Sequence, residues 1–351
     1  MKKLKNDLLI SILIPNFNKG AYVQETLDSV LFQTYINWEC IIVDDHSTDN
    51  SWKKIEEYVK MDSRFKAFKR PDNLQKGGNT CRNYALHLSK GDLILFLDSD
   101  DVLADFCLSQ RILSALENPD FDFWAFPTAL FEKKPSDARF YWNVDNSKET
   151  DLGRFFRMDA LWQTSGCLYN RDFLIKVNGL SPGRQFWQDY ELHLKALICS
   201  KSYRKFFHLS PDVFIRNGDS SSLSRSTPFT ADFTILLKRI SFLEEILTFA
   251  KIHNRGLTDL EFQSIFSFQY YLILQLWLRH RKLMLFWKKW NSYCKNYQIP
   301  IWIQLLGLIE SFFLKLKINI GNKLRSSFEN ISVVPIYSIL EKVQIGKHPI
   351  T

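Results

Sequence analysis

Short apolar runs alternate with segments of helical periodicity over the first third of the chain. Runs rich in apolar and β-branched residues predict strands at residues 8–14, 39–43, 65–69, 93–97 and 121–126. Apolar residues spaced three and four apart predict helices at residues 21–33, 51–59, 80–89 and 105–116. Because strands and helices alternate at this spacing, we expect an α/β fold with a mostly parallel sheet covered by helices on both faces.

The pattern becomes less regular after the last of these strands. Mixed polar residues at 132–162 predict a loop with one short helix. A further helix is expected to begin near Gln188, and two strands that pair with each other are expected at 203–208 and 213–216.

A change in composition then divides the chain. The Ser-rich segment 218–226 predicts a boundary between an α/β domain at residues 1–225 and an α-helical domain at residues 226–351. The first contains 30 Lys and Arg and 30 Asp and Glu, whereas the second contains 16 and 8, so the helical domain carries the whole net charge of +8. A basic region beside apolar helices indicates an anionic partner surface, with membrane lipid favoured over nucleic acid. A helical domain that is basic without such a partner is the alternative.

The helical domain contains one segment, residues 299–318, that is long and apolar enough to suggest a membrane span. Glu310 interrupts it, and a charge at the centre of a spanning helix costs about 2.5–3.5 kcal/mol on insertion scales. An interfacial helix or a buried core helix is therefore preferred. The N-terminus lacks a signal-peptide pattern, and the six cysteines show no disulfide or metal spacing. We expect a cytoplasmic protein, peripheral on the inner face of the plasma membrane.

Acidic residues gather directly after the strand at 93–97. Asp98, Asp100 and Asp101 lie within four residues, where their carboxylates repel one another unless a cation or solvent relieves the repulsion. Oxygen ligands in this position suit Mg²⁺ or Mn²⁺ that is itself bound to substrate phosphates. The alternative is an acidic turn that caps the following helix.

Three other segments suit a nucleotide. Asp44 ends the second strand, where a carboxylate can accept hydrogen bonds from a nucleobase or a ribose, and Phe17 follows the first strand and can face a nucleobase. Gly77 and Gly78 precede a helix that carries Arg82, a combination that suits a phosphate or a ribose. Neither GxGxxG nor a P-loop motif occurs, so dinucleotide-binding and P-loop interpretations lose their main support.

Together these segments resemble the family 2 glycosyltransferases, which have the GT-A fold. The similarity extends over residues 8–225, with the motifs in the family's order and spacing. The matching segments are SILIPNFN at 11–18, SVLFQTY at 29–35, WECIIVDD at 38–45, STD at 47–49, RN at 82–83, KG at 90–91 and FLDSDD at 96–101. The resemblance implies a Rossmann-like, mostly parallel sheet flanked by helices and followed by an α-helical region.

The resemblance also implies roles for individual residues. Pro15, Phe17 and Asp44 would line the nucleobase pocket. Asp98 would contact the ribose side of the donor, and Asp100 would bind the metal that bridges the donor phosphates. The family usually has Tyr where this chain has Phe17, a change that keeps the ring and loses a hydroxyl.

The catalytic base of the family lies in a Glu-Asp pair that opens a helix. The matching pair here is Gln188-Asp189, so the resemblance assigns the base to Asp189. We interpret Gln188 as a subfamily trait, because Gln still donates and accepts hydrogen bonds. A structural acid at a helix N-terminus is the alternative for Asp189.

A final matching segment follows the predicted strand at 213–216. Arg216 and the serines at 220–222 resemble the part of the family that closes over the diphosphate. Arg82 and Arg216 are therefore candidates to bind the donor near its leaving group. The family often has a metal-binding His here, but this chain has Asn, Gly and Asp at 217–219.

These roles imply an inverting glycosyltransferase with Mn²⁺ or Mg²⁺ as cofactor. It would move a sugar from a nucleotide-diphosphate sugar, expected to be a UDP-sugar, to an acceptor hydroxyl in the synthesis of cell-surface polysaccharide or glycan. Asp189 would remove the acceptor proton in a single in-line displacement. The expected partners are this donor, a glycan or lipid-linked acceptor and an anionic membrane surface, with no nucleic acid.

Two other classes of protein share some of these features. A non-catalytic protein that binds a nucleotide sugar, or that scaffolds a membrane glycan assembly, would be compatible with Gln188 and with the missing His. A nucleotidyltransferase also uses carboxylates and a divalent ion in a Rossmann-like sheet. That class has a Gly-rich loop with Arg or Lys directly after the first strand, and PNFN at 15–18 does not match it.

Overall fold

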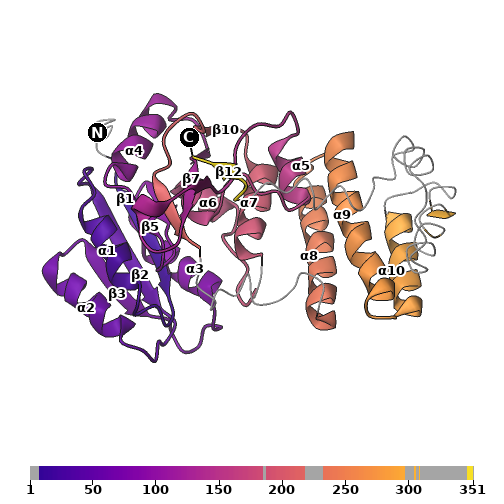
Figure 1. Ribbon diagram of the computed structural model, residues 1–351, viewed down its shortest axis with the longest axis horizontal. Coiled ribbons are helices and arrows are strands. Elements are labelled where there is room, and N and C mark those ends of the chain that lie inside the picture. Colours follow the sequence, from indigo (N-terminus) through magenta and orange to yellow (C-terminus); the bar gives the residue numbers. More distant parts are fainter. Residues whose placement is uncertain are drawn as a thin grey trace. The chain divides into compact units, whose positions relative to one another are not determined.

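The computed structural model of the chain divides into two compact units (Figure 1). The described residues are 8–184, 187–217, 232–296, 304–305, 308 and 346–350. Unit 1 comprises Met1–Ser147, Ala160–Ser220 and Gln344–Thr351, and unit 2 comprises Lys148–Asp159 and Ser221–Val343. The expected boundary between residues 225 and 226 lies outside the described residues, as does most of the segment 299–318. In the described part of the chain, every helix is too short or too polar to cross a membrane.

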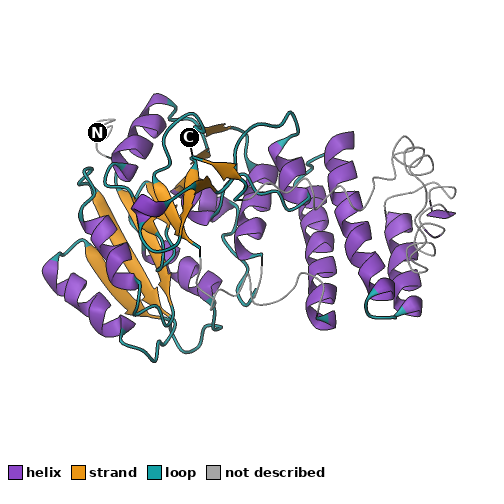
Figure 2. Cartoon of the chain, viewed as in Figure 1, coloured by secondary structure: helices purple, strands orange, loops and turns teal. Residues whose placement is uncertain are grey.

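Unit 1 is built on a seven-stranded sheet. Its strands are β1 (Ile10–Asn16), β2 (Trp38–Asp44), β3 (Phe65–Lys69), β4 (Leu93–Phe96), β6 (Phe123–Ala125), β9 (Cys167–Asn170) and β10 (Tyr203–Lys205). From edge to edge their order is β10-β6-β9-β4-β1-β2-β3. The strands β4, β1, β2 and β3 are parallel, and β9 is antiparallel to β4 and β6. The expected mostly parallel sheet is therefore confirmed (Figure 2).

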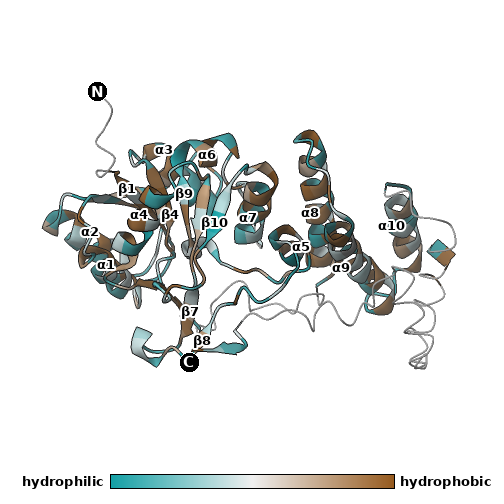
Figure 3. Cartoon of the chain, turned by 90° about the horizontal axis from the view of Figure 1, so that it is seen from above, coloured by the Kyte–Doolittle hydropathy of each residue, from teal (hydrophilic) through white to brown (hydrophobic). Residues whose placement is uncertain are grey.

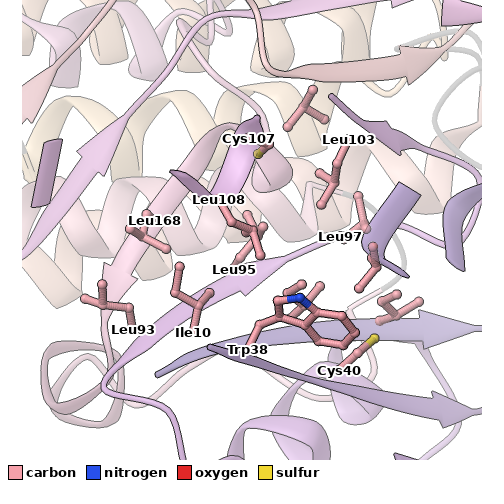
Figure 4. Close-up of a cluster of buried hydrophobic side chains, with 14 of the residues drawn as sticks. Ile10, Trp38, Cys40, Leu93, Leu95, Leu97, Leu103, Cys107, Leu108 and Leu168 are labelled. Atoms are coloured by element: carbon pink, nitrogen blue, oxygen red, sulfur yellow. The ribbon is translucent and has the colours of Figure 1, made fainter. Parts of the chain in front are cut away.

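Helices cover both faces of this sheet. They are α1 (Val23–Leu31), α2 (Ser51–Met61), α3 (Gly78–Leu88), α4 (Cys107–Glu117), α6 (Arg171–Lys176) and α7 (Gln188–Cys199). Figure 3 shows α3 and α6 along one side of the sheet and α1 and α2 along the other. All seven residues of β2 are buried, the pattern of a strand that is covered on both faces. Ile10 of β1, Leu95 of β4 and Leu108 of α4 lie in one buried cluster (Figure 4).

A second sheet of five short strands adjoins the first within unit 1. Its members are β5 (Val102–Leu103), β7 (Thr128–Phe131), β8 (Phe140–Tyr141), β11 (Val213–Arg216) and β12 (His348–Pro349). Their order is β12-β8-β7-β11-β5. Residues 132–162 contain the expected short helix, at Asp151–Phe156, and in addition the short strand β8 and a 3-10 turn at Pro135–Asp137, which the sequence did not predict.

The predicted pairing of residues 203–208 with 213–216 is wrong. Both strands form, but β10 pairs with β6 in the large sheet, and β11 pairs with β5 and β7 in the small sheet. A stacked pair of rings accompanies the pairing of β10 with β6, since the ring of Tyr203 lies 4.7 Å from the ring of Phe123 on β6, centroid to centroid. Proximity in sequence suggested that the two strands pair with each other, whereas each of them pairs with strands that are distant in sequence.

Unit 2 is helical in its described part, and a helical region was expected at residues 226–351. It contains α5 (Asp151–Phe156), α8 (Phe233–Ile252), α9 (Asp259–Leu278) and α10 (Leu283–Asn296). A capping box starts α9: Thr258 Oγ1 accepts the N–H of Glu261 at 3.3 Å, and the Glu261 carboxylate accepts the N–H of Thr258 at 2.9 Å. α9 packs against α5, α8 and α10 and is therefore the central helix of this unit.

Candidate active site

The carboxyl ends of β1, β2 and β4 lie next to one another at one edge of the large sheet. Asn16 lies opposite Asp44 in the register of β1 and β2, and Leu13 lies opposite Phe96 in the register of β1 and β4. The loops after these strands therefore begin side by side, where ligand sites form in open α/β sheets. This geometry brings together the predicted residues that follow each of the three strands.

Asp44 is buried and holds the loops after β1 and β2. Its Oδ1 accepts hydrogen bonds from Asn16 Nδ2 at 2.7 Å and from Ser47 Oγ at 2.5 Å, and its Oδ2 accepts the Ser47 N–H at 2.9 Å. Pro15 is partly buried beside Asn16, and Phe17 exposes 41% of its surface. The β1 loop thus presents an accessible aromatic ring next to a fixed carboxylate.

The loop before α3 reaches the ring of Phe17. The ammonium of Lys76 lies 4.2 Å from the ring centroid, a cation–π contact. Asp45 anchors this loop, because its Oδ1 accepts Arg70 Nε at 2.5 Å and its Oδ2 accepts the Gly77 N–H at 2.9 Å. Gly77 has φ 140°, a conformation that favours glycine. Sequence reasoning assigned this loop to a phosphate or ribose and missed the contact between Lys76 and the ring.

Two carboxylates of the acidic segment after β4 are paired with cations. Arg82 Nη2 donates to Asp98 Oδ1 at 2.5 Å, and Lys19 Nζ donates to Asp100 Oδ2 at 2.7 Å. Lys19 belongs to the loop after β1, so its contact with Asp100 appears only once β1 and β4 are neighbours. No spacing in the sequence indicates it, and sequence reasoning missed this residue.

Asp101 is buried and does not cap the following helix. Its Oδ1 accepts the backbone N–H of Arg216 at 3.1 Å, whereas α4 follows Phe106, whose side chain makes no capping bond. The alternative interpretation of the segment as a helix cap is therefore wrong for Asp101. Burial raises the pKa of Asp101 well above its usual range, and the charges of Asp100 and Asp98 raise it further.

Arg216 lies beside the acidic segment at the end of β11. Its Nε donates to the carbonyl of Asp100 at 3.1 Å, and its Nη2 pairs with Glu25. The guanidinium also lies over two rings, 4.6 Å from the centroid of Tyr22 and 4.4 Å from that of Phe131. In this arrangement Arg216 fixes the backbone that carries Asp100. Its expected contact with the donor stays a prediction.

Asp189 lies in the first turn of α7, beside Arg82 and Asp98. The preceding Gln188 accepts a hydrogen bond from Arg82 Nη1 at 3.0 Å, so one guanidinium joins α7 to the segment after β4. Burial raises the pKa of Asp189, the backbone N–H of Tyr190 and the charge of Arg82 lower it, and the charge of Asp98 raises it, with a raised pKa as the net result. The carboxylate assigned as the base thus shares a site with the acidic segment.

Glu191 holds the start of α7 through three side-chain contacts. Arg184 Nε donates to its Oε2 at 2.6 Å, Lys195 Nζ pairs with its Oε1 at 2.7 Å, and the Ser181 hydroxyl also donates to it. Burial raises the pKa of Glu191, but the hydrogen bonds from Lys195 and Ser181 and the nearby positive charges lower it overall. An ionised Glu191 therefore holds the turn that positions Asp189.

The acidic segment suits a divalent ion with a single protein carboxylate as ligand. Among the residues that the structure describes, no three His, Cys, Asp or Glu side chains converge on a common point. Asp100 is partly exposed and its partner is an ammonium, so a cation that binds there replaces Lys19. One carboxylate suffices where donor phosphates and water supply the remaining oxygen ligands, as Mg²⁺ commonly requires.

Sequence comparison identifies the family of the chain. The sequence pattern of Glycosyl transferase family 2 matches residues 11–177. The chain is 31% identical over 232 residues to the glycosyltransferase GlyG of Streptococcus pneumoniae, and the match covers 62% of this chain and 73% of GlyG. The chain belongs to glycosyl transferase family 2. The expected family is therefore confirmed, and the matched region contains the strands β1, β2 and β4 that form the site.

Other family 2 relatives match a shorter part of the chain. The Escherichia coli protein WfgD, a UDP-Glc:α-D-GlcNAc-diphosphoundecaprenol β-1,3-glucosyltransferase, is 39% identical over 113 residues. This match covers 32% of the chain and 43% of WfgD, so the chain spans less than half the length of this relative.

A solved structure shares the whole fold. S. aureus TarS 1–349, in complex with UDP-GlcNAc, superposes with a TM-score of 0.63 at 16% identity and covers 95% of this chain and 91% of its own. At this identity the likeness concerns the fold. It confirms the expected architecture of a mostly parallel sheet flanked by helices, with a helical region after it.

Proposed function

We propose that this family 2 protein transfers a sugar from a nucleotide-diphosphate sugar to an acceptor hydroxyl, with inversion at the anomeric carbon. The observation that carries the proposal is the position of Asp189 beside Arg82 and Asp98 at the carboxyl edge of the sheet. A single displacement requires a carboxylate base on one side of the anomeric carbon and donor-binding groups on the other side.

A UDP-sugar is the proposed donor. The exposed ring of Phe17 lies next to Pro15 and Asp44 and offers a face for a nucleobase, with Lys76 on the same ring. TarS, which has the same fold, binds UDP-GlcNAc, and WfgD is named for a UDP-sugar. Asp98 lies further along the edge, where it suits the ribose side of the donor.

Asp189 acts as the base in the proposed reaction. The acceptor oxygen forms a bond to the anomeric carbon while the bond from that carbon to the diphosphate oxygen breaks, and the acceptor proton moves to the Asp189 carboxylate. The raised pKa of Asp189 makes this carboxylate a stronger base than an ordinary Asp. A positioned base of this kind contributes roughly 10²–10⁴-fold to the rate.

Mn²⁺ or Mg²⁺ is the proposed cofactor, and Asp100 is the residue that would hold it. When bound, such an ion neutralises negative charge on a departing diphosphate. Lys19 and Arg82 place two further positive charges at the same edge. Arg216 supports the site by fixing the backbone of Asp100.

A glycan or lipid-linked glycan of the cell surface is the proposed acceptor. WfgD is named for a diphosphoundecaprenol-linked acceptor, and the basic helical half of this chain suits work at a membrane. We therefore propose a cytoplasmic location, peripheral on the inner face of the plasma membrane.

A donor screen tests the proposal. The chain is incubated with UDP-, GDP- and dTDP-sugars in the presence of Mn²⁺, and release of the nucleotide is measured with Asp189→Asn as control. We expect release from at least one UDP-sugar and its loss in the variant. Tight binding of a nucleotide sugar without hydrolysis or transfer to any acceptor would instead support the non-catalytic alternative.

A further inference from the structure

The connection between α9 and α10 and the start of α10 form a surface that combines cations with exposed apolar side chains. This α10 surface consists of six residues, all exposed: Arg281, Lys282, Leu283, Met284, Trp287 and Lys288. It lies within unit 2, far along the chain from the residues of the candidate active site.

Packing against α9 fixes which side of α10 is exposed. Trp290 lies 4.8 Å from Tyr270 of α9, ring centroid to ring centroid, and Tyr293 Oη donates to the carbonyl of Phe266 at 2.8 Å. Trp287 and Lys288 lie three and four residues after Met284, and these spacings place all three side chains on the same face of the helix. Rotation of α10 to bury them would break its contacts with α9.

The apolar side chains of the α10 surface are unusually accessible. Met284 exposes 87% of its surface, Leu283 44% and Trp287 41%. Single exposed apolar residues are common, but three of them next to one another, one of them a tryptophan, are typical of a contact surface. Both hydrophobic and hydrophilic stretches of α10 are visible in Figure 3.

The charged residues on α10 and in the segment before it are all basic. Residues 262–309 contain six Lys and Arg and no Asp or Glu. An acid from another element, Glu244 of α8, faces α10, and it pairs with Lys289 at 3.1 Å. Arg281, Lys282 and Lys288 therefore stand in a stretch of chain that repels cations and attracts anions.

We propose that the α10 surface binds an anionic phospholipid membrane. Arg281, Lys282 and Lys288 contact the lipid headgroups, while Leu283, Met284 and Trp287 enter the boundary between headgroups and acyl chains. A nucleic acid fits less well, because it would use the cations and leave the apolar side chains in water. This proposal extends the proposed function. It rests on that function only for the membrane-bound acceptor.

Vesicle flotation tests the proposal with the full chain. Vesicles of phosphatidylcholine are compared with vesicles that also contain phosphatidylglycerol. We expect at least tenfold stronger binding to the anionic vesicles, weakened by salt because exposed charges are screened. The substitutions Arg281→Gln, Lys282→Gln and Lys288→Gln together should reduce binding at least tenfold.

Matched variants separate the apolar contribution from a general effect of substitution. Met284→Gln with Trp287→Gln should also reduce binding at least tenfold. The control is Lys60→Gln with Met61→Gln on α2, an exposed cation and methionine of unit 1, and it should bind like the unmodified chain. Thermal melting and hydrolysis of the donor without vesicles, which should be unchanged in all variants, show that each variant is folded.

Two outcomes would overturn the proposal. One is equal binding of the unmodified chain and the α10 variants to anionic vesicles, or no binding at all, while donor hydrolysis persists. The other is a dimer in sedimentation that Met284→Gln with Trp287→Gln dissolves, which would assign the α10 surface to a second copy of the chain. Because hydrolysis is measured separately, failure of the proposed function is distinguishable from failure of membrane binding.

Discussion

The ion pair between Lys19 and Asp100 determines how a cation can enter the site. The ammonium and the carboxylate lie 2.7 Å apart, and both are partly exposed. A divalent ion that binds Asp100 must compete with this ammonium. Under the proposed role of Asp100 as the metal ligand, metal affinity depends on a basic residue that is not itself a ligand.

We expect Lys19→Met to raise the affinity of the protein for Mn²⁺. A partly exposed ion pair is worth about 1 kcal/mol, so its removal should tighten metal binding by about fivefold. Titration calorimetry with Mn²⁺ and UDP measures this directly. Lys60→Met on α2 is the control, and Asp100→Ala should abolish the metal dependence of UDP binding. Unchanged Mn²⁺ affinity in Lys19→Met would show that the pair does not compete with the metal.

The pH dependence of transfer should report the raised pKa of Asp189. A general base must be ionised, so kcat falls as pH decreases through this pKa. Because burial raises the pKa of Asp189, the acid limb of the kcat profile should have its midpoint above the ordinary Asp pKa of about 3.9. A pH profile of kcat, with the fold monitored by circular dichroism at each pH, measures the limb.

Substitution of Gln188 provides a matched test of the same acid limb of the kcat profile. Its Oε1 accepts a hydrogen bond from Arg82, and a glutamate at this position keeps that acceptor and adds a negative charge next to Asp189. A nearby like charge disfavours ionisation. Gln188→Glu should therefore move the acid limb to higher pH, and a shift to lower pH would argue against Asp189 as the titrating group.

At the scale of secondary-structure elements, a buried ion pair joins α4 to the segment before β11. Arg111 Nε donates to Asp212 Oδ2 at 2.8 Å and Nη2 donates to Oδ1 at 2.7 Å, and both side chains are fully buried. Arg111 Nη1 also donates to the carbonyl of Ser165 at 2.8 Å. The bidentate geometry and the third bond compensate for the cost of burying two charges.

We expect Arg111→Met to reduce the free energy of unfolding by about 3–5 kcal/mol. The substitution leaves the Asp212 carboxylate buried without its cation, which is the costly case for a buried pair. Urea unfolding measures the change. The double variant Arg111→Met with Asp212→Asn should recover part of the loss, and equal stability of Arg111→Met and the unmodified chain would contradict the importance of this pair.

The elements that the sequence predicted well are the long ones. β1, β2, β3 and the helices between them appear within a few residues of their expected bounds, because their apolar pattern extends over several turns or strand residues. The strands β5, β7, β8 and β12 of the small sheet, two to four residues long, carry too little pattern to be recognised, whereas β11 was predicted at its observed bounds. The pairing partners could not be predicted either: β10 and β11 are close in sequence, but they pair with strands that are distant in sequence and belong to different sheets.

The same distinction applies to the site. Asp44 ends β2, and Asp98 and Asp100 come shortly after β4, so strand order alone predicts that these residues lie at the same edge of the sheet. Lys19 reaches the acidic segment from the loop after β1 and Arg216 from the end of β11, and only the fold places them there. A residue whose role depends on a contact across the sheet has no pattern of its own in the sequence.

For the molecule as a whole, the ionised Asp189 should cost stability. A carboxyl with a raised pKa in the folded state binds protons more readily there than in the unfolded state, so the free energy of unfolding falls as pH rises through this range. Asp189→Asn removes the charge and should melt at a higher temperature than the unmodified chain at pH 7. Scanning calorimetry measures the difference, which should vanish at a pH below both pKa values.

The two units separate the two activities proposed for the chain. The residues of the candidate active site all belong to unit 1, whereas the excess positive charge belongs to residues 226–351. Which helices expose the charge could not be predicted, because the packing of α10 on α9 decides which of its faces is accessible.

The central claim is that Asp189 removes the acceptor proton, and Asp189→Asn tests it most directly. Donor affinity by calorimetry and the rate of sugar transfer are measured on the same preparation, once the donor has been identified. We expect the dissociation constant of the donor to stay within about threefold, and the rate of transfer to fall by roughly 10²–10⁴-fold. A transfer rate close to that of the unmodified chain would contradict the account.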